Sequence, residues 1–174
     1  SKVPLSFKAN MDINLTGSNL NDFTGTLDIN DLDMVSKDSA YNMKKISIIS
    51  RTSIKGGKEL KVDSDLGQIM IEGQYDIPNI VKSIKKIIRT NYPYITKNWK
   101  EDIVAGNTVQ KFDFNINLTH SKNYLSLLGL YDSYFRKLDI KGRIDTYKNE
   151  LSLASGIPFF KIKKDSLQDL QLLM

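Results

Sequence analysis

Few residues in this chain have the type and spacing that catalysis or metal binding would need. Cysteine is absent and His120 is the single histidine, so thiolate catalysis, disulfides and cysteine-based metal sites are excluded. His120 ends an alternating stretch and precedes a turn, and no clustered carboxylate accompanies it, which favours an ordinary surface role. Neither a Ser-His-Asp pattern nor a glycine-rich phosphate loop is present. The sequence therefore predicts a non-enzymatic protein with no catalytic residue, metal or cofactor.

Two acidic runs resemble fragments of a calcium-binding loop: DINDLD at 28–33 and DSD at 63–65. Both lack the glycine at the sixth position and the glutamate at the twelfth position that such a loop requires. Acidic residues at alternate positions are also typical of the solvated face of a strand. We therefore interpret both runs as surface and not as cation sites.

Most of the chain alternates apolar and polar residues, which predicts strands with one apolar and one wet face. The longest case runs from Val3 to Leu15, where every odd position is apolar. This face is the candidate working surface, because no convergent polar set competes with it. The residues expected to line an apolar groove are Leu5, Phe7, Met11, Ile13, Leu15, Ile69, Ile71, Phe112, Phe114, Ile116 and Leu118.

Breaks in the alternation predict how the strands are connected. The apolar phase slips by one residue after Ile29, which indicates a bulge near Asn30 and Asp31. A Lys-Gly-Gly-Lys turn at 55–58 is expected to join its flanking strands into an antiparallel hairpin. The final third is predicted to be a meander with turns at 147–149 and 156–158.

An apolar-x-Gly-x-apolar pattern occurs three times: FTGTL at 23–27, IEGQY at 71–75 and IKGRI at 140–144. Glycine within a strand is common where a sheet bends sharply or where another backbone comes close. Long one-sided strands with such glycines predict a sheet that curls around its apolar face.

Helical periodicity replaces the alternation at 77–92. Asp76 is expected to cap the helix, Pro78 suits its first turn, and Pro93 disfavours helical geometry at Tyr92. The helix is expected to cover part of the sheet with Ile80, Val81, Ile84, Ile87 and Ile88.

The opposite face of this helix is basic, with Lys82, Lys85, Lys86 and Arg89. Such a face could lie on anionic lipid or on nucleic acid. A solvated face is the preferred interpretation, and nucleic acid is the least favoured, because aromatic residues are not interleaved with the lysines.

Two stretches lack a clear strand pattern. Residues 94–108 are interpreted as a connection that is expected to be mobile. Residues 121–129 begin with a capping-type Ser121 and have apolar spacing that predicts a short helix. No run of about 18 apolar residues occurs that could span a bilayer as a helix.

The sequence thus predicts a mainly β fold: a long curved antiparallel sheet, forming an open groove or a taco-like half-barrel, with one inserted amphipathic helix. Residues 1–174 are interpreted as a single β-rich domain or as a fragment of a longer, repetitive β-groove protein. The apolar face exceeds what one short helix can cover. Either a second sheet covers it or it lines a groove for an apolar ligand.

Several segments are similar to a known family: FTGTLDINDLDM, YNMKKISIIS, KELKVDSDLGQIMIEGQYDIPNIVKSIKKII, FDFNINLTHSKNYLSLL and NELSLASGIPFFKIKKDSLQDLQLL. This order resembles interior segments of TamB-like members of the AsmA superfamily, especially the versions in Bacteroidetes-type bacteria. In those segments a strand carrying Ser-Asp, and then an apolar-x-Gly-x-apolar strand, lead into a short amphipathic helix. Ser64, Asp65, Ile71, Gly73 and Tyr75 follow that order here. The likeness covers about residues 20–174 and includes no catalytic signature.

The resemblance implies a periplasmic segment of a protein anchored in the inner membrane of a Gram-negative cell, with membrane association through parts outside this fragment. Its strands would form a trough for phospholipid or another acyl-chain ligand moving between inner and outer membranes, or serve outer-membrane assembly with a partner protein. No nucleic-acid partner is expected. The alternative is a structural protein–protein interaction module, a β-sandwich or meander without bound lipid.

Overall fold

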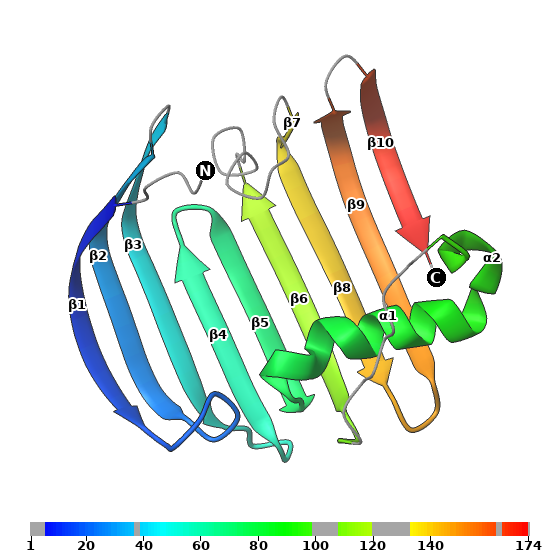
Figure 1. Cartoon of the computed structure of the whole chain (residues 1–174), viewed down its shortest axis with the longest axis horizontal. Helices are drawn as coiled ribbons and strands as arrows, with labels where there is room; N and C mark the ends of the chain where they lie inside the picture. The colour runs from blue at the N-terminus through cyan, green and yellow to red at the C-terminus, as the bar shows by residue number, and fades with distance from the viewer. Residues whose placement is uncertain (1–5, 37–38, 99–107, 120–132, 163–164, 174) are drawn as a thin grey trace.

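A curved antiparallel meander accounts for nearly all regular structure in the computed structural model (Figure 1). The structure describes residues 6–36, 39–98, 108–119, 133–162 and 165–173. The strands are β1 (Ser6–Thr16), β2 (Thr24–Ser36), β3 (Ser39–Thr52), β4 (Lys58–Ser64), β5 (Gly67–Gln74), β6 (Lys111–Thr119), β7 (Ser133–Phe135), β8 (Lys137–Asp145), β9 (Glu150–Ile162) and β10 (Asp165–Leu173). The helices are η1 (Ile77–Asn79), α1 (Ile80–Asn91) and α2 (Pro93–Thr96).

The strand order along the sheet is β1-β2-β3-β4-β5-β6-β8-β9-β10, and β7 pairs with β9 in line with the start of β8. All of these pairs are antiparallel, and the sheet does not close, so β1 and β10 are its two edges. The predicted mainly β fold, with a long curved antiparallel sheet and one inserted helix, is confirmed. No helix within the described residues is long and apolar enough to cross a membrane.

The strand register places the apolar residues of successive strands side by side on one face. Because side chains alternate with a period of two, an unshifted register carries one face across the whole sheet. One such line, which we call the central apolar row, contains Ile13, Leu27, Ile48, Val62, Ile69, Ile116 and Ile140. The apolar face predicted strand by strand is therefore continuous across seven neighbouring strands.

The predicted bulge and hairpin are both present. The register between β1 and β2 shifts between Lys8 and Asn10, and Asp31 has a left-handed φ of 52°. This extra residue returns Leu32 and Met34 to the apolar face. Strands β3 and β4 pair antiparallel across the Lys-Gly-Gly-Lys turn.

Two glycines of the recurring pattern have conformations that other residues rarely adopt. Gly25 and Gly73 have φ values of 124° and 136°. A side chain at either position would collide with the backbone of the neighbouring strand. Gly142 instead leaves room for the ring of Phe114 on β6. The pattern therefore marks close approach between strands, as expected.

The inserted helix has nearly the predicted bounds, but its N-terminal cap differs. Tyr92, with φ −132° and ψ 60°, lies outside helical geometry before Pro93, as predicted. The Asp76 carboxylate makes no capping hydrogen bond to the helix backbone. It accepts hydrogen bonds from the side-chain amides of Asn21 and Asn79 instead, so the capping prediction was wrong.

The predicted turn at 156–158 was also wrong, because β9 continues through it. Gly156 pairs with Asp139 of β8, and pairing with β7 resumes at Phe160. Pro158 lies in the gap between these two pairings, where its missing backbone N–H interrupts the ladder without ending the strand. A proline is therefore tolerated inside this strand.

Residues 94–108, predicted as one connection, begin with regular structure. The short helix α2 occupies Pro93–Thr96, and the Thr96 side chain is 2% exposed. Its hydroxyl lies within hydrogen-bond distance of the carbonyl oxygens of Tyr92 and Pro93. Residues 99–107 and the helix predicted at 121–129 lie outside the described residues.

Candidate functional site

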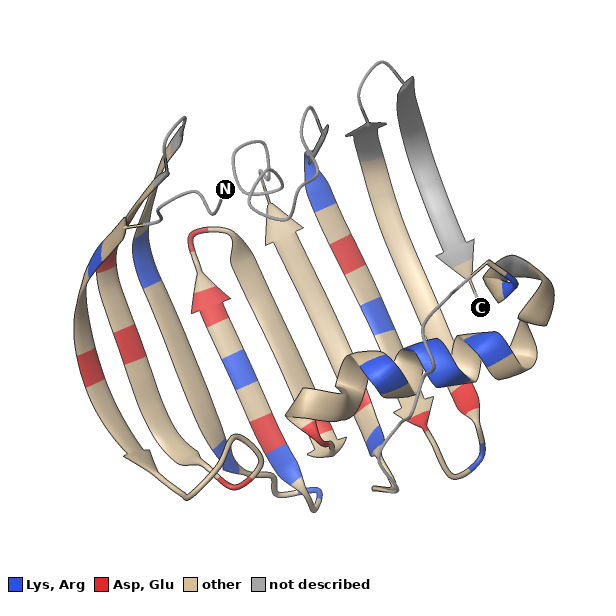
Figure 2. Ribbon diagram, viewed as in Figure 1, with Lys and Arg blue, Asp and Glu red and all other residues tan. Residues whose placement is uncertain are grey.

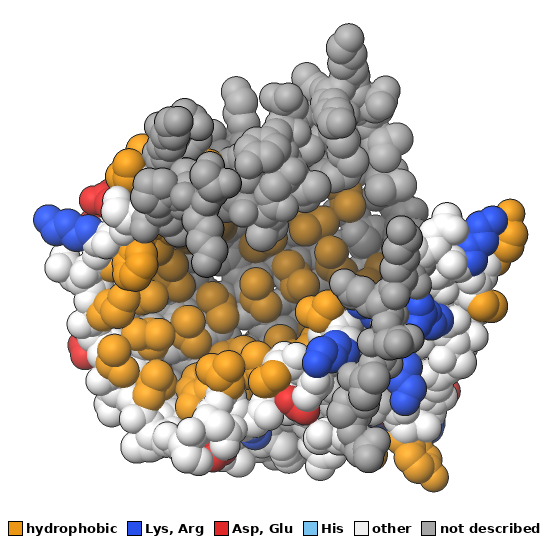
Figure 3. Space-filling view, in the orientation of Figure 1, with side chains coloured by type: hydrophobic (Ala, Val, Ile, Leu, Met, Phe, Trp, Pro, Cys, Tyr) orange, Lys and Arg blue, Asp and Glu red, His pale blue; other side chains and the backbone are white. Residues whose placement is uncertain are grey.

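The concave face of the sheet forms a hollow lined by hydrophobic side chains (Figure 3). At the β1 edge of this face, Phe7, Met11 and Ile13 are 69%, 54% and 61% exposed. Large apolar side chains that lie next to one another on a strand are rarely exposed to this extent. Contiguous exposed apolar surface commonly marks a binding site. Leu5, also predicted to line the groove, lies outside the described residues.

The middle of the concave face is half-buried. Except on edge strand β1, which carries Leu15, neighbouring strands flank its side chains on both sides within the sheet, which removes part of their surface from water. The predicted lining residues in this state are Leu15, Ile69, Ile71, Phe114, Ile116 and Leu118. The structure thus brings these predicted residues onto one partly open surface.

Helix α1 covers the remaining end of the face, crossing the start of β6, the end of β8 and the start of β9 (Figure 1). Ile87 of α1 forms a buried cluster with Tyr75, Phe112 and Ile144, which lie beneath the helix. The rings of Tyr75 and Phe112 meet edge to face, with centroids 6.2 Å apart. Phe112 is 3% exposed, so its assignment to the groove lining was wrong: it belongs to the covered core.

Four of the five residues expected on the covering face of the helix are partly or fully buried. Ile80, Ile84 and Ile87 pack in the core cluster, and Ile88 is half-buried. Val81 is 63% exposed, so its assignment was wrong. It lies too far around the helix from Ile87 to face the sheet.

A polar residue, Ser83, occupies part of the buried face of α1. Its hydroxyl accepts a hydrogen bond of 2.7 Å from Nε2 of Gln110, which lies just before β6. Oε1 of Gln110 accepts a hydrogen bond of 3.1 Å from the backbone N–H of Asp76. Gln110 is 1% exposed and therefore joins the start of β6 to both the helix and its entry.

Asp76 is the centre of a second set of contacts that fix where the helix begins. Nδ2 of Asn21 donates to its carboxylate at 3.0 Å, and Nδ2 of Asn79 donates at 2.8 Å. Oδ1 of Asn21 accepts a hydrogen bond from the Ile77 backbone N–H. The amides of Asn79 and Asn21 hold the pKa of Asp76 below its ordinary value. Sequence reasoning missed this cluster because Asn21 lies 55 positions before Asp76.

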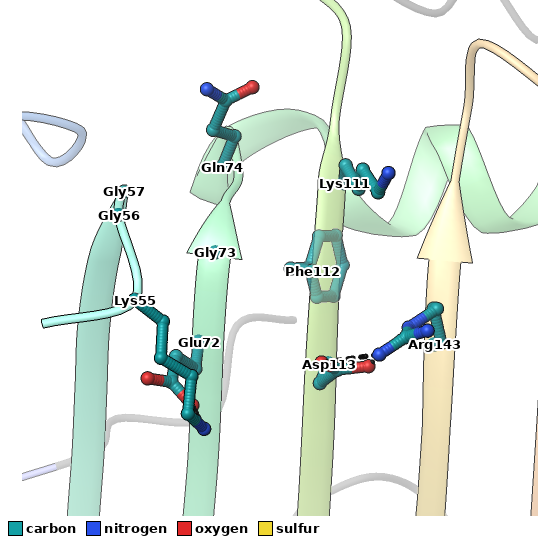
Figure 4. Close-up of a pocket in the computed structure, with 10 residues that line it drawn as sticks. All are labelled: Lys55, Gly56, Gly57, Glu72, Gly73, Gln74, Lys111, Phe112, Asp113 and Arg143. Atoms are coloured by element: carbon teal, nitrogen blue, oxygen red, sulfur yellow. Dashed lines mark hydrogen bonds and ion pairs between the residues drawn. The ribbon is translucent and has the colours of Figure 1, made fainter. Parts of the chain in front are cut away.

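The convex face carries charge in place of apolar surface. Figure 4 shows a shallow pocket there, in which Lys55 pairs with Glu72 at 2.8 Å and Arg143 pairs with Asp113 at 2.6 Å. Lys55 holds the pKa of Glu72 below its ordinary value, and Arg143 does the same for Asp113. Paired surface carboxylates of this kind are ordinary ion pairs on a wet sheet face.

Metal ligands do not gather on either face among the described residues, where no group of three His, Asp or Glu side chains could hold an ion. Of the acidic runs, Asp63 pairs with Lys61 at 2.9 Å and accepts a hydrogen bond from Gln68. His120 lies outside the described residues. The concave face is therefore the strongest candidate site.

Searches against protein-family models, curated proteins and solved structures gave no significant match to this chain. The function of the concave face is therefore argued from its geometry and chemistry.

Proposed function

We propose that this chain is a non-enzymatic segment of a bacterial envelope protein whose apolar groove takes phospholipid acyl chains between the inner and outer membranes, or serves outer-membrane protein assembly. The periplasm is the compartment that this role requires, with an inner-membrane anchor supplied by other parts of the protein. The observation that carries the proposal is the continuous, partly open apolar face from Ile13 to Ile140.

The face suits a lipid because it can cover tails while a headgroup stays in water. Each CH₂ group removed from water contributes about 0.8 kcal/mol, so a long acyl chain gains substantially from a strip of apolar side chains. The concave face is open above its partly exposed residues, which leaves room for a charged headgroup outside the strip (Figure 3). A fully enclosed pocket would instead have to desolvate the headgroup.

Native mass spectrometry of the protein purified from bacterial membranes tests the proposal. We expect an added mass equal to a phospholipid. Ile13→Asp should lower the lipid-bound fraction by roughly tenfold, because it places a charge against acyl chains at the exposed edge. Asn14→Asp is the matched control, since it adds the same charge on the opposite face of the same strand. An empty protein, or equal losses in both variants, would contradict the proposal.

A protein–protein interaction module is the second candidate, and edge strand β1 favours it. Within the described residues β1 pairs with β2 alone, so its outer N–H and C=O groups can accept another strand. This module would be favoured over the groove if the purified protein carries no lipid and binds a partner protein through edge strand β1. The Ile13→Asp variant should then form the same complex.

A further inference from the structure

The inserted helical segment, residues 77–98, accounts for the net charge of +5 of the chain. Residues 77–98 contain five Lys or Arg residues and no Asp or Glu. The full chain has 25 Lys and Arg against 20 Asp and Glu, so the remainder carries twenty of each and is formally neutral. A surplus of five positive charges without an acidic residue in one short segment differs from the mixed charges expected on a merely soluble surface.

The basic residues of α1 gather on the side that faces away from the sheet. We call Lys82, Lys85, Lys86 and Arg89 the basic helix face; they fall within an arc of about 100° on an ideal helix. Lys82 and Lys86 are exposed, and Lys85 and Arg89 are partly exposed, whereas Ser83 and Ile87 are buried. Figure 2 shows these charges along α1, and Figure 3 shows basic side chains at the margin of the apolar hollow.

Exposed apolar and aromatic side chains flank this charge. Val81, Tyr92 and Tyr94 are 63%, 42% and 80% exposed. Nζ of Lys97 lies 4.7 Å from the centre of the Tyr94 ring, which keeps a further cation beside an aromatic group. Lysines beside tyrosine and an aliphatic side chain match the headgroup region of a bilayer, where the charge meets phosphate and the rings meet the acyl boundary.

We propose that the basic helix face, with Val81, Tyr92 and Tyr94, docks this protein onto the surface of an anionic phospholipid bilayer. Attraction of about 1 kcal/mol for each lysine or arginine near such a surface provides the binding, and the exposed rings add interfacial contacts. Docking in this way brings the margin of the apolar hollow to the bilayer. The surface is separate from the concave face, so it binds the bilayer whether the hollow is filled or empty.

Co-sedimentation of the 174-residue chain with vesicles tests the docking surface. We expect binding to vesicles of phosphatidylglycerol and phosphatidylcholine in equal parts, little binding to phosphatidylcholine alone, and loss of binding in 1 M salt, where screening acts within about 3 Å. Equal binding to both vesicle types, or binding that salt does not weaken, would overturn the proposal.

Charge reversal on the exposed helix positions gives the sharper comparison. The double variant Lys82→Glu/Lys86→Glu should weaken binding to anionic vesicles by at least roughly thirtyfold. Lys137→Glu/Lys141→Glu changes the net charge equally, at exposed positions on the convex face of β8, and should retain most binding. Equal losses in the two variants would show attraction by net charge alone and overturn the assignment to the helix.

Three further measurements distinguish bilayer docking by the basic helix face from binding to nucleic acid or in the groove. Tyr94→Ser should weaken vesicle binding several-fold while leaving the far-ultraviolet circular dichroism unchanged, because Tyr94 is 80% exposed. Preference of the basic helix face for a nucleic-acid duplex over anionic vesicles would overturn the membrane assignment. Lipid bound in native mass spectrometry should be unchanged in Lys82→Glu/Lys86→Glu, which keeps this test distinct from that of the groove.

Discussion

The two ends of the concave face contrast sharply although they are built from the same residue types. Phe112 is 3% exposed and Phe7 is 69% exposed; Ile144 is 0% exposed and Ile13 is 61% exposed. All four residues belong to strands of one sheet and alternate with polar neighbours. Alternation therefore places an apolar side chain on the face, but what lies above it decides whether it becomes core or surface.

The length of α1 explains why one part of the concave face is buried and the other is exposed. Twelve residues of α1 span about 18 Å, which matches roughly four strand spacings of about 4.8 Å. The nine strands of the main order need about 38 Å. One helix lying across the strands thus extends over about half of the width of the sheet, at one end of the strands, and the β1 side is left open.

Introducing a carboxylate on opposite sides of α1 should give the largest difference in the free energy of unfolding. Ile87→Asp puts an unpaired carboxylate into the cluster with Phe112 and Ile144, and should cost more than about 4 kcal/mol and unfold the covered end. Val81→Asp, at a position 63% exposed, should change the free energy of unfolding by less than about 0.5 kcal/mol. Urea denaturation followed by circular dichroism measures both. Similar losses in the two variants would mean that α1 does not cover the sheet in solution.

Equal truncations at the two ends of the face should give the next largest difference. Ile144→Ala leaves a cavity in a fully buried site and should cost about 2–5 kcal/mol. Ile13→Ala removes the same atoms from an exposed position and should cost less than about 0.5 kcal/mol. The midpoint of chemical denaturation reports the contrast. A large cost at Ile13 would indicate that another surface covers the β1 side in solution.

The contacts that hold the start of the helix should give the smallest, pH-dependent effect. Because the folded pKa of Asp76 lies below its ordinary 3.8, its stabilisation is present above that value and is lost as pH falls through the folded pKa. Asp76→Asn should therefore be less stable than the native protein by about 1–2 kcal/mol at pH 7. This difference should shrink as the pH falls below 3.8.

Thermal melts of the native protein and of Asp76→Asn, from pH 7 to below 3.8, would measure this difference in stability. Asn21→Ala, which removes one hydrogen-bond donor to Asp76, should reduce the loss of stability at low pH without abolishing it. Parallel pH profiles for the native protein and Asp76→Asn would show that this carboxylate does not hold the helix in place.

Local sequence pattern was enough to predict most of the strands, the bulge near Asn30 and Asp31 and the helix near 77–92. These features depend on neighbours within a few positions, where periodicity and glycine chemistry act. The contacts of Asn21 with Asp76 and of Gln110 with Ser83 could not be predicted, since they join residues far apart in the chain. Phe112 was misplaced for the same reason: whether it lines an open surface depends on where the helix lies.

The continuous β9 shows a different limit. Gly156 and Pro158 together favour a turn when only local preference is considered. Pairing with β8 before Pro158, with β7 after it and with β10 on both sides of it carries the strand through these residues. A local rule was overridden by the arrangement of neighbouring strands.

The strand order has a consequence for how the sheet can form. Strands β1 to β4 each pair with the next strand in the chain, across short connections. Short loops close at low entropic cost, so these strands can be added one hairpin at a time. The β5–β6 pairing must instead bring Gln74 and Lys111 together across the inserted helical segment. We therefore expect this junction to form late, with the first five strands as the template on which the helix and the remaining strands assemble.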